Sequence, residues 1–84
     1  MSTIALNSRE LGQRLRAERR ARGRTQAWLA ERVGCQRQTI AELEAGRNVA
    51  THILMGALAA LGKGLIIADA RIDLERIGDA FGDE

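Results

Sequence analysis

The stretch "GCQRQTIAELEAG", residues 34–46, sets an arginine between two glutamines at the start of a helical pattern. Arginine offers paired donors to guanine and the glutamine amide pairs with adenine, so Gln36, Arg37 and Gln38 have the chemistry to read base edges. The amino end of a helix also presents backbone N–H groups to phosphate. These residues indicate contact with DNA, and the alternative is a set of surface polar residues on an ordinary helical bundle.

The helix that carries these residues is predicted over about residues 36–45, with Gly46 closing it. At about 100° per residue, Ile40 and Leu43 fall on one side, and Arg37 lies on the flank. The opposite side holds Gln38, Ala41 and Glu42. The polar side is therefore predicted to face away from the core.

Two helices are predicted before it from their end signals. Asn7 caps the first, with Glu10 placed to reach back as in a capping box, and Gly23 ends it. Thr25 caps the second and Gly34 ends it. The helix that Thr25 caps and the helix over residues 36–45 are joined by a tight turn at Gly34. Two short helices joined in this way, with polar residues at the start of the later one, describe a helix-turn-helix.

A fourth helix is predicted over about residues 51–61, with one apolar stripe formed by Leu54, Ala57, Leu58 and Leu61. Gly56 inside this helix costs about 1 kcal/mol relative to alanine. We therefore interpret Gly56 as a point of close approach to another helix or another chain.

After Gly62 the residue pattern changes to that of a strand. Branched residues begin at Leu65, and apolar and charged residues alternate from Ala68 to Glu75. A helix through Leu74, Ile77 and Phe81 is the alternative for the last part. A lone strand has no partner in its own chain, so the simplest partner is the same strand of a second copy in a homodimer. The pairing residues would be Leu65, Ile66, Ile67, Ala68 and Ala70.

Charge divides the chain into two unlike parts. Residues 1–64 carry eleven Lys or Arg and five Asp or Glu, a net +6, whereas residues 65–84 carry two Arg and six acids, a net −4. Seven arginines lie between Arg9 and Arg24, which indicates either attraction to a polyanion or a solvated helix face. The acidic end is either a solubilising tail or a segment that orders on a basic protein partner.

Several classes of function are not supported by the sequence. The longest apolar stretch, residues 54–62, is far shorter than the roughly 20 residues of a membrane-spanning helix, and the first ten residues lack the pattern of a secretory signal. We therefore expect a cytoplasmic protein without membrane contact. His52 and Cys35 stand apart from any metal-ligand set, and no nucleophile, base and orienting group are suitably spaced. We expect no enzyme, metal, cofactor or small-molecule ligand.

The stretch "TQAWLAERVGCQRQTIAELEAG" resembles the XRE family, the lambda Cro and repressor-like helix-turn-helix regulators. The shared positions are Thr25, Gln26, Leu29, Ala30, Val33, Gly34, Thr39, Ile40, Glu44 and Gly46, and the resemblance covers about residues 11–62. It implies an all-α, lambda repressor-like bundle of four to five helices, with the strand added after it. It also implies a sequence-specific, DNA-binding transcriptional repressor.

The resemblance assigns roles to three sets of residues. The base contacts would be Gln36, Arg37, Gln38, Ala41 and Glu42. The phosphate contacts would be Gln26, Thr39 and Arg47. The structural ion pair would join Arg19 to Glu44. Glu42 departs from the family pattern, because an acid beside DNA repels phosphate unless it accepts a hydrogen bond from cytosine.

The stretch "ALAALGKGLIIADA" resembles the end of the HipB-like antitoxins, in which the fourth helix runs into a dimerising strand. This implies an antitoxin that represses its own toxin-antitoxin operon at a palindromic operator in the nucleoid, with a HipA-like kinase as the toxin partner. A free-standing XRE-type repressor and a helical module that binds only proteins are the alternatives. The chain then divides into a DNA-binding domain (1–64), a dimerising strand (65–75) and an acidic tail (76–84).

Two further residues have alternative interpretations. Trp28, the only tryptophan, sits roughly 120° away from the apolar side of its helix. It is either an anchor for a partner protein, since tryptophan is enriched in binding hot spots, or it covers arginine stems or the first helix. Cys35 is expected in the core rather than as a redox switch.

Overall fold

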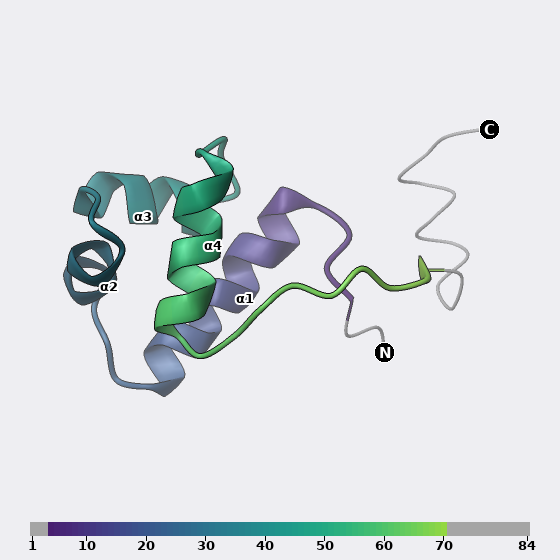
Figure 1. Ribbon diagram of the computed structural model, residues 1–84, viewed down its shortest axis with the longest axis horizontal. Helices are drawn as coiled ribbons and strands as arrows, with labels where there is room; N and C mark the ends of the chain where they lie inside the picture. The colour runs from purple at the N-terminus through teal and green to yellow at the C-terminus, as the bar shows by residue number, and fades with distance from the viewer. Residues whose placement is uncertain (1–3, 71–84) are drawn as a thin grey trace.

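The computed structural model describes residues 4–70, and these residues form four α-helices (Figure 1). The helices are α1 (Ser8–Ala21), α2 (Gln26–Val33), α3 (Arg37–Glu44) and α4 (Thr51–Ala60). α2 packs against α3 and α4, and α1 packs against α3. The described part of the chain is thus the predicted all-α bundle.

Polar caps set the start of α1 and α2, as the sequence predicts. The Asn7 side chain accepts a hydrogen bond from the backbone N–H of Glu10 at 2.8 Å, and that of Thr25 accepts from the backbone N–H of Trp28 at 3.0 Å. Glu10 reaches back one residue further than in a regular capping box, because its carboxylate accepts from the N–H of Leu6 at 2.9 Å. This bond also holds the chain that leads into α1.

Glycines in the left-handed conformation end the first three helices. Gly23, Gly34 and Gly46 have φ values of +66°, +87° and +84°, a region that residues with a Cβ rarely adopt. The predicted helix ends are therefore confirmed. At Gly46 a Cβ would also lie 2.7 Å from the Cα of Arg9, so this turn is pressed against the start of α1.

An aliphatic core fills the space between the helices. Its buried residues are Leu15, Leu29, Ala30, Ile40, Leu43, Ile53, Ala57, Leu58 and Leu61. Ile40 and Leu43 face inward, as the rotation of α3 predicts, and Cys35 packs against this core at its edge.

Two glycines mark close helix contacts. A Cβ on Gly12 would lie 2.5 Å from the carbonyl oxygen of Leu43 and 2.6 Å from that of Glu44, so α1 and α3 touch through their backbones. Sequence reasoning did not single out Gly12. A Cβ on Gly56 would lie 3.1 Å from Val33, so the close approach predicted there is to α2 of the same chain.

The chain leaves α4 at Leu61 and runs beside the N-terminal segment without regular secondary structure over residues 63–69 (Figure 1). A hollow of about 620 Å³ lies between residues 4–8 and residues 64–68. No strand is present within residues 4–70. Because the predicted pairing needs a second copy, the strand stays a prediction.

The predictions for residues 71–84 lie outside the described residues. They comprise the rest of the strand to residue 75, the alternative helix through Phe81 and the acidic tail 76–84. Within residues 4–70, no helix is long and apolar enough to cross a membrane.

Candidate nucleic-acid interface

The first residues of α2 and α3 meet through their side chains. Gln26 opens α2 and Arg37 opens α3, and the tight turn at Gly34 brings the two helix starts to one side of the bundle. There Nη1 of Arg37 donates to Oε1 of Gln26 at 2.7 Å. A residue predicted to contact phosphate thus holds a residue predicted to contact a base.

Gln26 is in turn fixed from behind. Its Nε2 donates to Oε1 of Glu44 at 3.1 Å, and Glu44 accepts two bonds from Arg19, from Nε at 2.7 Å and from Nη2 at 3.0 Å. Nη1 of Arg19 also donates to the carbonyl oxygen of Arg24 at 2.7 Å. We call the chain of side chains Arg19, Glu44, Gln26 and Arg37 the polar network.

The inner half of the polar network is buried. The side chains of Arg19 and Glu44 are only 8% and 3% exposed, and no buried side-chain nitrogen or oxygen among the described residues lacks a partner. The structure therefore brings the predicted ion pair together in a bidentate geometry, and Nη1, the third nitrogen of the guanidinium, bonds to a backbone carbonyl.

Burial and pairing act in opposite directions on the pKa of Glu44. Burial alone raises this pKa, but the hydrogen bonds from Arg19 and Gln26, with the positive charges of Arg19 and Arg16, outweigh burial and lower it below the ordinary glutamate value. The hydrogen bond to Glu44 raises the pKa of Arg19. Glu44 is therefore ionised at neutral pH and orients both Arg19 and Gln26.

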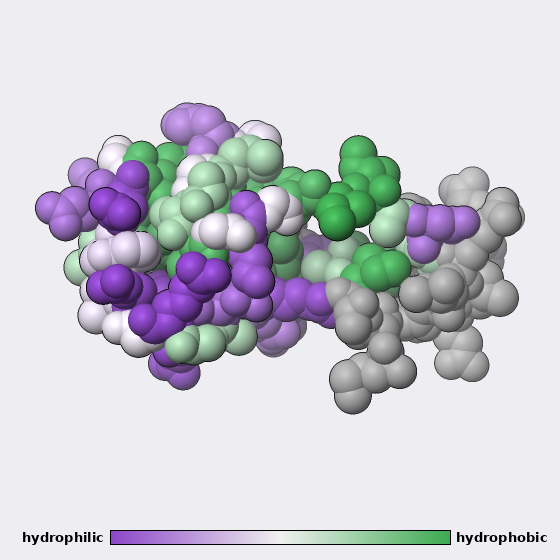
Figure 2. All heavy atoms as spheres, turned by 60° about the horizontal axis from the view of Figure 1, so that its bottom comes forward, coloured by the Kyte–Doolittle hydropathy of each residue, from purple (hydrophilic) through white to green (hydrophobic). Residues whose placement is uncertain are grey.

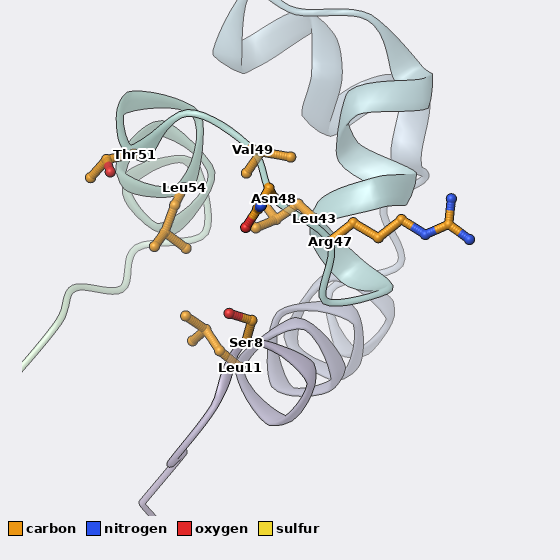
Figure 3. Close-up of a pocket in the computed structure, with 8 residues that line it drawn as sticks. All are labelled: Ser8, Leu11, Leu43, Arg47, Asn48, Val49, Thr51 and Leu54. Atoms are coloured by element: carbon orange, nitrogen blue, oxygen red, sulfur yellow. The ribbon is translucent and has the colours of Figure 1, made fainter.

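The other predicted contact residues lie around the amino end of α3 and beyond it. Gln36, Arg37 and Gln38 are exposed. Thr39, Ala41 and Glu42 are partly buried. Arg47 follows α3 at the rim of a hollow of about 100 Å³, and its guanidinium points away from that hollow into solvent (Figure 3). Gln26 and Arg37 are thus in contact, whereas Arg47 lies past the other end of α3.

Arginines extend the positive surface from α3 to α1. An open hollow of about 380 Å³ is lined by Arg16, Arg19, Arg20, Arg24, Thr25, Gln26, Ala27 and Arg37. Sequence reasoning noted the density of arginines but gave none of Arg16, Arg20 and Arg24 a role. The four-residue spacing of Arg16 and Arg20 was the available signal, since residues at i and i+4 share a helix face.

Trp28 lies against the guanidinium groups of two arginines, Arg24 and Arg32. The guanidinium carbon of Arg24 is 4.6 Å from the centre of a Trp28 ring, and that of Arg32 is 5.4 Å from it. Both distances are within the range of cation–π attraction. Of the interpretations given above, the structure thus supports the indole covering arginine side chains, and Trp28 also packs against the core and remains partly exposed.

Comparison with known families agrees with this architecture. The chain matches the model of the helix-turn-helix domain family over residues 10–82. No curated protein sequence matches it. The matched range includes nearly all of α1 and the whole of α2, α3 and α4. The chain therefore belongs to the helix-turn-helix domain family.

Proposed function

We propose that this protein is a sequence-specific DNA-binding transcriptional repressor that reads base edges with the amino end of α3. The observation that carries the proposal is the bond between Arg37 and Gln26, which holds an exposed arginine in place before any ligand arrives. An arginine fixed in advance loses less conformational entropy on binding, a saving of about 0.5 to 1.5 kcal/mol for one side chain.

Gln26 has the donors for two tasks at once. Its carbonyl oxygen accepts from Arg37, one Nε2 hydrogen goes to Glu44, and the second Nε2 hydrogen is free for a phosphate oxygen. Arg37 keeps most of its five N–H donors for guanine. The side-chain amide of Gln26 would thereby link the contact with a DNA phosphate to the contact that Arg37 makes with a base.

The start of α3 adds backbone donors. Gln36 is its N-cap but makes no side-chain cap bond, so Gln36 and Gln38 keep their side chains available for base edges. The N–H groups of the first helical turn have no intrahelical acceptor and favour an anion. We assign one phosphate contact to Thr39, in the first turn of α3, and another to Arg47, just after the carboxyl end of α3.

Repression in this proposal uses a homodimer. Leu65, Ile66 and Ile67 are exposed aliphatic residues in an extended segment, which supports pairing with the same segment of a second copy. A two-fold dimer would present two α3 helices about 34 Å apart, one turn of DNA, to a palindromic operator.

The narrower role that we propose is that of an antitoxin which represses its own operon. It is supported only by the similarity of residues 57–70 to the end of HipB-like antitoxins, and the toxin would be a HipA-like kinase. The free-standing repressor is the alternative in which the DNA contacts are the same and the toxin is absent. Co-expression with the neighbouring gene product and co-purification separates the two.

The test of DNA reading is a selection of duplexes from a random library, followed by Arg37→Ala on the selected site. We expect an inverted repeat, and we expect Arg37→Ala to weaken binding by about 1 to 3 kcal/mol while relaxing preference at one base pair in each half-site. Gln13→Ala, on the exposed side of α1, is the matched control.

Two outcomes would count against this reading. Equal weakening of Arg37→Ala on selected and scrambled duplexes would mean that Arg37 touches only phosphate. Absence of any enriched sequence, with affinity independent of salt, would favour the helical module that binds only proteins.

A further inference from the structure

Three exposed arginines line the open hollow of about 380 Å³ that reaches from α1 to the start of α3: Arg16, Arg20 and Arg24. We call this hollow the arginine hollow. No carboxylate among residues 4–70 forms an ion pair with any of the three, and the nearby carboxylate of Glu44 is already engaged by Arg19. Positive charges gathered in one hollow raise the local potential and attract an anion.

Arg24 is held at both its backbone and its side chain. Its carbonyl oxygen accepts a hydrogen bond from Nη1 of Arg19 at 2.7 Å, and its guanidinium carbon lies 4.6 Å from the centre of a Trp28 ring. A guanidinium over an aromatic ring uses its face for the ring and keeps its N–H groups at the rim, where they can donate to an oxyanion. Arg24 is thus positioned in advance, which lowers the entropy that it loses when an anion binds.

The start of α2 adds further donors to the arginine hollow. Gln26 and Ala27 are the first two residues of α2, and both line the hollow. The side chain of Thr25 bonds to the N–H of Trp28, whereas the earliest N–H groups of a helix have no intrahelical acceptor and favour an anion. Guanidinium groups, a side-chain amide and backbone N–H groups therefore surround one site, a combination that suits a phosphate.

We propose that the arginine hollow binds the DNA phosphate that Gln26 contacts, with Arg20 and Arg24 as ligands of the same phosphate. α1 and the turn after it are then a part of the DNA interface, beside α2 and α3. This inference rests on the proposed function, because α3 brings the duplex to the hollow. Arg37 lines the hollow and is bonded to Gln26, so the bound phosphate flanks the base pair that Arg37 reads.

The two sets of arginines have different tasks in this arrangement. A phosphate contact positions the protein on any duplex and carries no sequence information, whereas a contact with a base edge carries it. Arg20 and Arg24 therefore set the affinity for all DNA, and Arg37 sets the preference among sequences.

The first experiment measures affinity against salt concentration for Arg20→Gln with Arg24→Gln. Arg16 stays in place, because its charge also lowers the pKa of Glu44. We expect binding to the selected duplex and to an arbitrary duplex to weaken by the same factor, roughly tenfold, as for the loss of a hydrogen bond to a charged group. The plot of log affinity against log salt should become less steep by about 0.9, the value for one phosphate.

The matched control is Arg14→Gln with Arg22→Gln. It removes the same charge from exposed positions that do not line the arginine hollow, and circular dichroism checks that both double variants are folded. At about 0.15 M salt, where distant charges are screened, the control should change affinity by less than roughly twofold. Equal losses for the two double variants would overturn the inference, because they would show an effect of net charge alone.

The second experiment locates the phosphate on the DNA. Each backbone phosphate of the selected duplex is replaced in turn by a neutral methylphosphonate, and binding is measured for the natural protein and for Arg20→Gln with Arg24→Gln. We expect one position in each half-site at which the replacement weakens binding of the natural protein and leaves that of the variant nearly unchanged, because both changes remove the same contact. Identical profiles for the two proteins would overturn the shared phosphate.

Failure of the inference and failure of the proposed function give different results. If the hollow binds no phosphate, Arg37→Ala still relaxes base preference while the two double variants behave alike. If α3 does not read bases, no sequence is enriched and Arg37→Ala weakens binding to all duplexes equally, while the loss specific to Arg20 and Arg24 persists. If no form of the protein binds any duplex, both proposals are contradicted.

Discussion

The helical body and the segment after it satisfy their side chains in opposite ways. In α1 to α4 the aliphatic residues fill one core, and the buried charges of Arg19 and Glu44 pair with each other. In the segment after α4, Ile66 and Ile67 are 89% and 102% exposed. Figure 2 shows hydrophobic side chains that project from the molecule beside the helical body. The body is complete within one chain, whereas the segment has the composition of a surface that needs a partner.

One folded chain is enough to position the side chains of the candidate interface, whereas the exposed apolar segment needs a second molecule to cover it. The body places Arg37 against Gln26 without any ligand or partner. In the proposed homodimer, the segment would hold two such sites together, because a pair of α3 helices at a fixed spacing requires two copies. Substitutions in the body should therefore lower the free energy of unfolding, whereas substitutions in the segment should change the oligomeric state.

The largest expected effect in the body comes from the buried ion pair. Glu44→Gln leaves the guanidinium of Arg19 buried without its counter-charge, which should lower the free energy of unfolding by about 3 to 5 kcal/mol. Urea titration followed by circular dichroism measures this loss. Glu31→Gln, at an exposed position of α2, should change stability by less than about 0.5 kcal/mol. Similar values for the two variants would show that the pair contributes little.

The same pair predicts a direction for acid sensitivity. The pKa of Glu44 is lowered in the folded protein, so between its folded and unfolded pKa values the unfolded chain binds more protons. The stabilisation is fully present above the unfolded pKa and is lost as the pH falls through the folded one. The stability difference between the natural protein and Glu44→Gln should therefore shrink in acid. A difference that grows as the pH falls would contradict the sign of the shift.

The next effect in size tests the backbone contact between α1 and α3. Gly12→Ala places a methyl group 2.5 Å from the carbonyl oxygen of Leu43, and overpacking of this kind typically costs about 1 to 3 kcal/mol. The better helix propensity of alanine returns up to about 1 kcal/mol, so a net loss should appear as a lower Tm. Gly64→Ala is the control, because nothing lies within 4 Å of a Cβ there. Equal Tm values for Gly12→Ala and Gly64→Ala would mean that α1 and α3 move apart at little cost in stability.

The smallest effect on stability is expected in the segment. Ile66→Lys with Ile67→Lys removes no buried contact from the described chain and should change the stability of the body by less than about 0.5 kcal/mol. The two substitutions should nevertheless convert the proposed dimer to a monomer, which sedimentation velocity detects, and the affinity for the operator should fall. A dimer that persists in this variant would refute pairing through residues 65–70.

Helix ends and core faces followed from the sequence because their causes are local. Asn7 and Thr25 bond to N–H groups three residues ahead, and the glycines after the helices adopt conformations that depend on few neighbours. Ile40 and Leu43 followed from the 3.6-residue period alone. These features need no knowledge of how the helices pack.

The features that sequence reasoning missed depend on helix packing. The contact between Gln26 and Arg37 joins residues eleven positions apart, and the tightness at Gly12 arises only where α1 crosses α3. The ion pair between Arg19 and Glu44 came from a family resemblance and not from the pattern of residues. The strand proposal concerns a second chain, so no property of one folded chain decides it.

The most direct test of the central claim is an NMR titration of the labelled protein with a selected duplex. We predict that the amide signals of residues 36–39 and the Nε–H signal of Arg37 shift most, with Gln26 following through its shared bond. Shifts confined to α4 or to residues 63–69, with the amino end of α3 unchanged, would contradict DNA reading by this helix.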